Sequence, residues 1–143
     1  MKKIILTAIL AVSIAATSFA AGKNTITNIV KNHFNAEFSN AEDVQWSATN
    51  SYAVATFLTD NKRMKAFYDF DGSLIGTSQG ITIESLPSFA KRAYAKKYAN
   101  YLVKEAIRFD DKNDTAYYIS ASNEKESVVV KITGGQMTTL KKS

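Results

Sequence analysis

The spacing of apolar residues changes twice from the period of a helix to that of strands, and this change constrains the fold most. From about Thr25 to Phe38 they recur every three or four residues, which predicts an amphipathic helix. Apolar and polar residues then alternate up to Ser78, which predicts four short strands. A helix beginning at Leu86-Pro87 and four further strands repeat this order up to Leu140.

Turn residues separate the expected strands and favour hairpin connections between them. Asp71-Gly72 is typical of a tight hairpin, because glycine adopts positive φ without steric cost. Gly134-Gly135 has the corresponding place in the second half. The expected strands cover residues 44–47, 52–59, 63–70, 73–78, 102–109, 115–122, 127–133 and 136–140.

These patterns predict an α+β fold, since helices and runs of strands are segregated. We expect a tandem helix plus four-stranded antiparallel meander, in two structural repeats of about residues 24–80 and 85–143. Both helices would pack on one face of a continuous antiparallel sheet, which leaves the other face open. A cystatin-like sheet wrapped on one helix would explain the first half alone, and the repeated order favours the two-helix arrangement.

Residues 1–20 have the pattern of a secretory signal peptide. A pair of lysines precedes the uncharged run Ile4–Ala16, and Ser18 and Ala20 are the small residues that a signal peptidase accepts. The apolar run is shorter than the roughly 20 residues of a membrane-spanning helix, the alternative interpretation. We therefore expect cleavage, no stable membrane insertion afterwards, and a single domain over residues 21–143 in the periplasm or secreted.

Composition excludes several kinds of site. The chain has no cysteine, which excludes disulfides, a thiol nucleophile, a Cys-ligated metal and a lipid anchor on cysteine. The single histidine, His33, lies beside the apolar stripe of the first helix, so neither a catalytic triad nor a transition-metal site is expected. The formal net charge of +5 falls to +3 without the two signal lysines, which does not indicate nucleic-acid binding. We assign no catalytic residue, no cofactor and no metal ligand.

The charged clusters have structural interpretations. Asp69 and Asp71, and the three aspartates within residues 110–114, lie in predicted turns, where Asp is favoured on backbone grounds. Neither stretch has the spacing of an EF-hand loop, although a weak Ca²⁺ contact at residues 110–114 is an alternative. The basic residues within 91–97 fit the solvated face of the second helix, with anionic lipid or an acidic partner as the alternative.

Several short motifs together give the chain a family resemblance. They are Phe38-Ser39-Asn40-Ala41, Val44-Gln45-Trp46, Tyr52-Ala53-Val54-Ala55-Thr56-Phe57, Ala66-Phe67-Tyr68-Asp69-Phe70-Asp71-Gly72 and the Leu86-Pro87 helix start. With the signal pattern, the chain resembles the β-lactamase-inhibitor-like, PepSY-like family of small exported bacterial proteins over nearly all of residues 21–143. The resemblance implies a fold like that of the β-lactamase inhibitor protein, whose sheet forms a concave binding surface. It does not imply β-lactamase inhibition, because no inhibitor contact residue matches and the inhibitors contain disulfides.

Aromatic residues in the strands are the candidate binding residues. Phe67 alternates in phase with charged neighbours and Tyr118 with small ones, so both are expected on the open face. Tyr52 and Phe57 belong to a stretch that is apolar on both faces, so their orientation is ambiguous. Exposed aromatics are frequent anchors of protein interfaces. The alternative is that a curled sheet or a dimer buries them.

The sequence therefore predicts an exported, non-catalytic binding module that docks an extracytoplasmic protein or peptide, with enzyme inhibition as one version. A periplasmic small-ligand carrier, with its ligand held between helices and sheet, is the alternative from another class. An enzyme ranks third, because no nucleophile–base pair is visible. Thermal stabilisation by small molecules would indicate the carrier, and stabilisation by protein alone the binding module.

Overall fold

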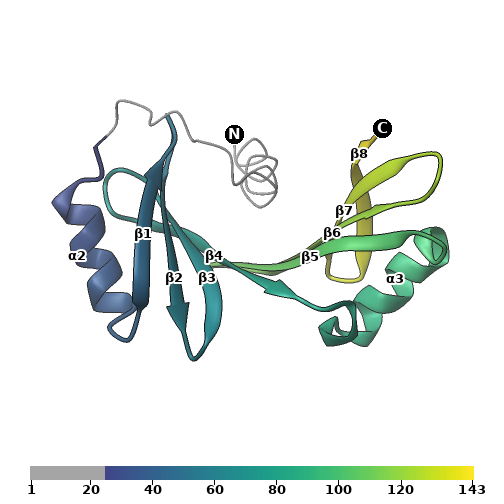
Figure 1. The fold of residues 1–143 in the computed structure, drawn as a ribbon, viewed down its shortest axis with the longest axis horizontal. Helices are drawn as coiled ribbons and strands as arrows, with labels where there is room; N and C mark the ends of the chain where they lie inside the picture. The colour runs from purple at the N-terminus through teal and green to yellow at the C-terminus, as the bar shows by residue number, and fades with distance from the viewer. Residues whose placement is uncertain (1–24) are drawn as a thin grey trace.

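The computed structural model describes residues 25–143, so the expected signal peptide lies outside the described residues. Its elements are α2 (Asn28–Glu37), β1 (Glu42–Ala48), β2 (Ala53–Thr59), β3 (Lys62–Tyr68), β4 (Leu74–Ile81), the 3₁₀ turn η1 (Ile83–Ser85), α3 (Ser88–Tyr98), β5 (Leu102–Asp111), β6 (Thr115–Ser122), β7 (Ser127–Thr133) and β8 (Gln136–Lys142). The strands form one eight-stranded sheet in chain order, and each pair is antiparallel (Figure 1). The predicted α+β class is confirmed, and direct pairing of β4 with β5 makes the sheet continuous.

The two helices lie on the same face of the sheet. α2 buries Val30 and Phe34 against β2 and β3, and α3 buries Ala90 and Tyr94 against β5, β6 and β7. Directly paired residues project to the same side, and the register from β3 through β4 to β5 keeps both contact surfaces on one face. Figure 1 shows that this is the convex side of a strongly curved sheet. The other, concave side has no described helix.

The helix starts follow from local backbone chemistry. Thr27, in an extended conformation, accepts a hydrogen bond from the amide of Val30 through its Oγ1 atom and begins α2. The helix therefore begins at Asn28, after the expected start near Thr25. Pro87, expected inside the first turn of the second helix, stands just before it, and its carbonyl accepts hydrogen bonds from the amides of Ala90 and Lys91. No helix of residues 25–143 has the length and apolarity needed to span a bilayer.

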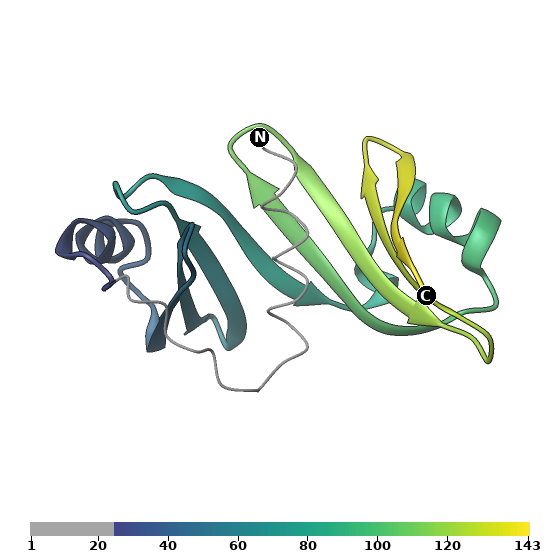
Figure 2. The same ribbon diagram turned by 90° about the horizontal axis from the view of Figure 1, so that it is seen from above.

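Irregular pairing and small residues accompany the curvature. Register shifts interrupt the β1–β2, β3–β4, β5–β6 and β7–β8 pairs, and such bulges bend and twist strands. β4 joins the two halves and presents Gly76, Ser78 and Gly80 to the concave side. Gly76 has no room for a side chain, because an added Cβ would lie 2.5 Å from Cζ of Phe109. Seen from above in Figure 2, the sheet twists between its two helix-bearing ends.

Candidate binding surface on the concave face

A group of buried apolar side chains lies on the concave side of the sheet. This concave cluster consists of Tyr52, Val54, Phe67, Ile107, Phe109, Ala116 and Tyr118. Phe67 is central, with its ring centroid 5.8 Å from that of Tyr52 and 5.9 Å from that of Phe109. The register explains the grouping, because Phe67 pairs with Val54 on β2 and with Gly76 on β4. Phe109 lies over that glycine and completes the contact.

Three of the four predicted binding residues come together, and the fourth does not. Tyr52, Phe67 and Tyr118 all belong to the concave cluster. Phe57 points to the convex side, where its ring centroid is 5.0 Å from that of Phe34 and 4.9 Å from that of Phe38. The sequence left the orientation of Phe57 ambiguous, and the structure places its side chain on the convex side, apart from the other three candidate binding residues. Phe57 belongs to the core beneath α2, because it is out of phase with Val54 on β2.

The exposure expected for Phe67 and Tyr118 is contradicted, and the structure agrees with the alternative that these aromatics are buried. Phe67 is 0% exposed, Tyr118 is 1% and Tyr52 is 2%. Alternation along a strand fixes the side to which a residue points and leaves its accessibility undecided. On this concave side, the ring of Phe67 packs against those of Tyr52 and Phe109.

The concave cluster contains two buried tyrosine hydroxyls without hydrogen-bond partners. They belong to Tyr52 and Tyr118. Burial raises the pKa of both phenols, and the negative charge of Asp111 raises that of Tyr118 further. The other buried side-chain group without a partner in residues 25–143 is Oγ1 of Thr133, which is in phase with Lys131, the residue paired with Tyr118. A buried hydroxyl without a partner costs about 1–3 kcal/mol, and each can both donate and accept.

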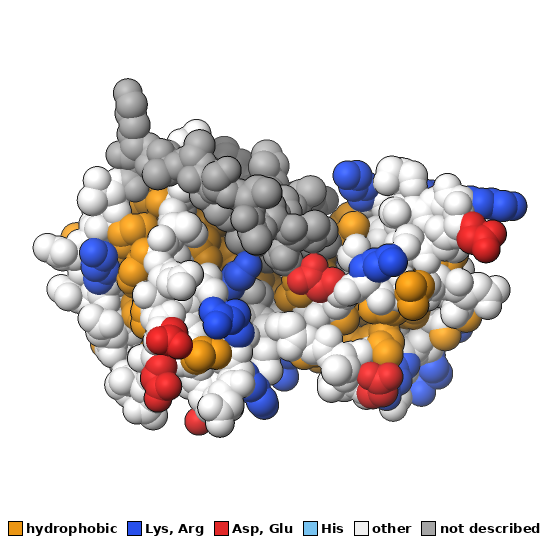
Figure 3. Space-filling model, viewed as in Figure 1, with side chains coloured by type: hydrophobic (Ala, Val, Ile, Leu, Met, Phe, Trp, Pro, Cys, Tyr) orange, Lys and Arg blue, Asp and Glu red, His pale blue; other side chains and the backbone are white. Residues whose placement is uncertain are grey.

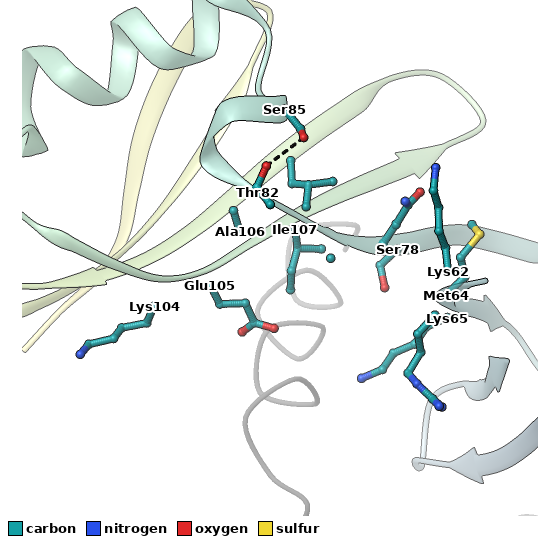
Figure 4. Close-up of a pocket in the computed structure, with 14 residues that line it drawn as sticks. Lys62, Met64, Lys65, Ser78, Thr82, Ser85, Lys104, Glu105, Ala106 and Ile107 are labelled. Atoms are coloured by element: carbon teal, nitrogen blue, oxygen red, sulfur yellow. Dashed lines mark hydrogen bonds between the residues drawn. The ribbon is translucent and has the colours of Figure 1, made fainter. Parts of the chain in front are cut away.

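An open groove of about 800 Å³ adjoins the concave cluster where β3 separates from β4 and β5. We call it the waist groove, and Figure 4 shows Lys65 of β3 and Glu105 of β5 on its two walls, with Lys104 pointing away from these two side chains. Its basic lining residues are Lys62, Arg63, Lys65 and Lys104, and its acidic one is Glu105. Burial lowers the pKa of Lys65, and the negative charge of Glu105 opposes that shift. Sequence reasoning missed this groove, although a glycine inside a strand, Gly80, is a signal for close backbone approach.

The polar residues of the β3–β4 turn have structural roles. His33 donates a hydrogen bond from Nδ1 to the carbonyl oxygen of Gly72, 2.6 Å away, which ties α2 to the turn. Asp69 and Asp71 each accept a hydrogen bond from the amide of Ser73. Burial, and then the interaction with Asp71, raises the pKa of Asp69, while the same interaction lowers the pKa of Asp71. These contacts agree with the turn interpretation of both aspartates.

The aspartates of the turn at residues 110–114 also accept hydrogen bonds from nearby residues. Oδ1 of Asp111 accepts hydrogen bonds from the amides of Asn113 and Asp114, and Oδ1 of Asp110 accepts one from the hydroxyl of Thr115. Across residues 25–143, no group of three His, Asp or Glu side chains is arranged to hold a metal ion. The concave cluster and the waist groove are therefore the candidate sites.

No protein-family model matches the chain, and no curated protein matches it in sequence. Solved structures with the same fold do exist. A DUF2874 family protein from Bacteroides ovatus ATCC 8483 has a TM-score of 0.74 at 19% identity, covering 84% of this chain and 88% of that one. A BLIP-like (β-lactamase-inhibitor-protein-like) protein from Bacteroides fragilis NCTC 9343 has a TM-score of 0.71 at 17% identity, covering 85% and 88%.

A third structure, named "putative periplasmic proteins", comes from Bacteroides eggerthii DSM 20697. Its TM-score is 0.74 at 14% identity, covering 84% of this chain and 89% of that one. At such identities the similarity shows the fold alone, because one fold hosts many functions. The fold is BLIP-like, and the PepSY-like part of the resemblance stays a prediction.

Proposed function

We propose that the chain is an exported, non-catalytic module that docks an extracytoplasmic protein or peptide on the concave face. The observation behind this proposal is the pair of buried, unpartnered hydroxyls of Tyr52 and Tyr118. Buried polar groups are nearly always hydrogen-bonded, so each exception calls for an explanation. Because both hydroxyls are buried, a ligand reaches them only by displacing the groups that cover them, and one that then supplies hydrogen bonds to these phenols would remove their cost and gain affinity.

The surroundings of the concave cluster fit an interface. Aromatic side chains at the centre with polar residues around them are the usual anatomy of a protein–protein contact. Lys131 pairs with Tyr118 on one side of the cluster, and Lys65 pairs with Ser78 on another. The repeated order of a helix and four strands supports one domain made of two structural repeats. The signal pattern of residues 1–20, together with the name of the Bacteroides eggerthii protein, supports a periplasmic or secreted location.

The described chemistry favours binding over the other two classes. His33 is held by the carbonyl of Gly72, and the aspartates of the turns accept hydrogen bonds from their own backbone amides, which supports a non-catalytic role. Packed rings fill the contact between α2 and the sheet, with centroids of Phe34 and Phe57 5.0 Å apart, which does not favour a small-ligand carrier there. Enzyme inhibition is one version of the binding module.

A capture experiment with paired variants tests the proposal. The full chain, exported with its own N-terminal residues, is immobilised and exposed to extracytoplasmic and secreted proteins of the source organism. Tyr52→Phe/Tyr118→Phe removes the two unpartnered hydroxyls, and Tyr68→Phe/Tyr98→Phe removes two hydroxyls from the convex side as a control. We avoid Phe67→Glu, because a charge at this buried position would unfold the cluster.

We expect the wild type and the convex control to retain one protein, which the concave variant binds about tenfold more weakly, or less. Equal retention by all three chains would place the binding surface elsewhere. A folded wild type that retains nothing, but gains thermal stability with a small molecule, would favour the carrier.

A further inference from the structure

Part of one edge of β4 has no strand partner. The last residue pair between β3 and β4 at this end is Met64 with Gln79, whereas β4 continues beside β5 through Gly80 and Ile81. The edge of these last two residues that faces β3 therefore pairs with no described strand. Backbone groups on such an edge are the usual docking points for an extended peptide.

The floor of the waist groove is open to a close approach of another backbone. A Cβ atom added to Gly80 would meet no heavy atom within 4 Å, whereas one added to Gly76, on the same strand and side, would collide with Phe109. Gly80 therefore leaves space beside the unpaired edge, and this space belongs to the groove.

Exposed cations stand on both walls of the groove. Lys62 and Arg63 come from β3 and Lys104 from β5, and all three are exposed. None of them forms an ion pair with another residue of the described range 25–143. The negative charge of Glu105 in the groove favours the charged form of Lys65. Figure 3 shows Lys and Arg side chains near the middle of the molecule, together with an acidic side chain between them.

We propose that the waist groove binds an extended segment of a partner protein that contains Asp or Glu side chains. The backbone of this segment would lie along Gly80 and Ile81, while its carboxylates pair with the outer cations. Arg63 can hold a carboxylate through two parallel hydrogen bonds. This proposal rests on the proposed function and adds the chemistry of the partner. The two surfaces are contiguous, because Ile107 belongs to both the concave cluster and the groove lining.

Other anions fit less well. The lining residues include no aromatic side chain on which a nucleic-acid base could stack. A lipid surface would require cations on a protruding face rather than on the two walls of a groove. An acidic peptide satisfies both the cations and the unpaired backbone edge.

Direct binding of short peptides to the full chain tests this assignment. Fluorescence anisotropy follows a labelled peptide of alternating Thr and Glu, its Thr–Lys counterpart, and a Thr–Glu peptide N-methylated at alternate residues. We expect only the unmodified Thr–Glu peptide to bind, and its affinity to fall as salt rises. Arg63→Glu/Lys104→Glu should lower that affinity by roughly tenfold or more. Lys91→Glu/Arg92→Glu changes the net charge equally on the exposed face of α3 and should change the affinity less than about twofold.

Three outcomes overturn the assignment. Equal losses in the two charge-reversal variants would mean that net charge alone attracts the peptide. Full binding of the N-methylated peptide would remove the role of the β4 edge. Binding of phosphatidylserine vesicles, but not of the Thr–Glu peptide, by the wild type would make the groove a lipid site.

The failure of this assignment can be distinguished from failure of the proposed function. If Tyr52→Phe/Tyr118→Phe loses the captured protein while Arg63→Glu/Lys104→Glu retains it, the proposed function stands and the acidic segment is excluded. If both variants retain it, both proposals fail.

Discussion

Both faces of the sheet bury tyrosines, but the hydroxyls of these tyrosines are hydrogen-bonded on one face and not on the other. On the convex face, the hydroxyl of Tyr68 donates to Oε2 of Glu37 at 2.5 Å, and that of Tyr98 shares a hydrogen bond with Oγ1 of Thr139 at 2.8 Å. On the concave face, the hydroxyls of Tyr52 and Tyr118 have no partner. Burial alone therefore does not distinguish the structural face from the candidate binding face. The hydrogen bonding of the buried hydroxyls distinguishes the two faces, because on the convex side Tyr68 and Tyr98 have partners within the fold.

The largest expected effect tests which face provides the main core. Phe34 lies between α2 and the sheet, with ring centroids 5.2 Å from Trp46 and 5.0 Å from Phe57. Phe34→Ala should therefore lower the free energy of unfolding by about 3–5 kcal/mol, measured by urea denaturation with circular dichroism. Phe67→Ala should cost less, because Phe67 has fewer ring contacts. A larger loss in Phe67→Ala would make the concave cluster the principal core and reverse the comparison.

Two glycines on β4 sharpen the comparison within the concave face. Gly76→Ala should destabilise the fold by about 1–3 kcal/mol, since the new methyl group would lie 2.5 Å from Phe109 and 2.7 Å from the carbonyl oxygen of Asp110. Gly80→Ala is the matched control, with no atom within 4 Å, and should be neutral or stabilise by up to about 1 kcal/mol. The urea midpoints of the two variants measure this difference in stability. Equal midpoints would show that Phe109 does not close over Gly76.

Local patterns predicted the elements better than the site. Thr115–Ser122 and Ser127–Thr133 are strands with the predicted bounds, because both are rich in β-branched and aromatic residues and polar turns flank them. β4 extends beyond the predicted Ser78 to Ile81, since pairing with β5 supports a stretch of weak strand propensity.

The candidate site could not be predicted from local sequence patterns, because it is formed by residues from different strands. Parity placed Phe67 and Tyr118 on one face, but it did not predict that both would be buried in a cluster with residues of other strands. The groove forms where β3 leaves β4, so its walls combine Lys62 with Lys104, which are far apart in the sequence. Such long-range geometry follows from the register, which the sequence pattern does not specify.

A Tyr→Phe substitution should change the free energy of unfolding in opposite directions on the two faces. Tyr68→Phe removes a hydrogen bond to Glu37 and should destabilise the fold by about 0.5–1.5 kcal/mol. Tyr118→Phe removes a buried hydroxyl without a partner and should stabilise it by about 1 kcal/mol. Urea denaturation of both variants under one buffer condition gives the comparison. A loss in Tyr118→Phe as large as that in Tyr68→Phe would show that the concave hydroxyl is already hydrogen-bonded.

The smallest expected effect is on stability at alkaline pH. Burial raises the pKa of Tyr118 above the value of 10.0 for an unperturbed phenol, so the folded chain holds this proton more tightly than the unfolded chain. The associated stability is present below pH 10 and is lost as pH rises above it, because only the unfolded phenol then ionises freely. Between pH about 8 and pH about 10.5, the melting temperature should therefore fall less for Tyr118→Phe than for the wild type. The corresponding difference in the free energy of unfolding is under about 1 kcal/mol. Equal falls would mean that the phenol of Tyr118 meets water in the free chain, and the contrast between the two faces would lose its physical basis.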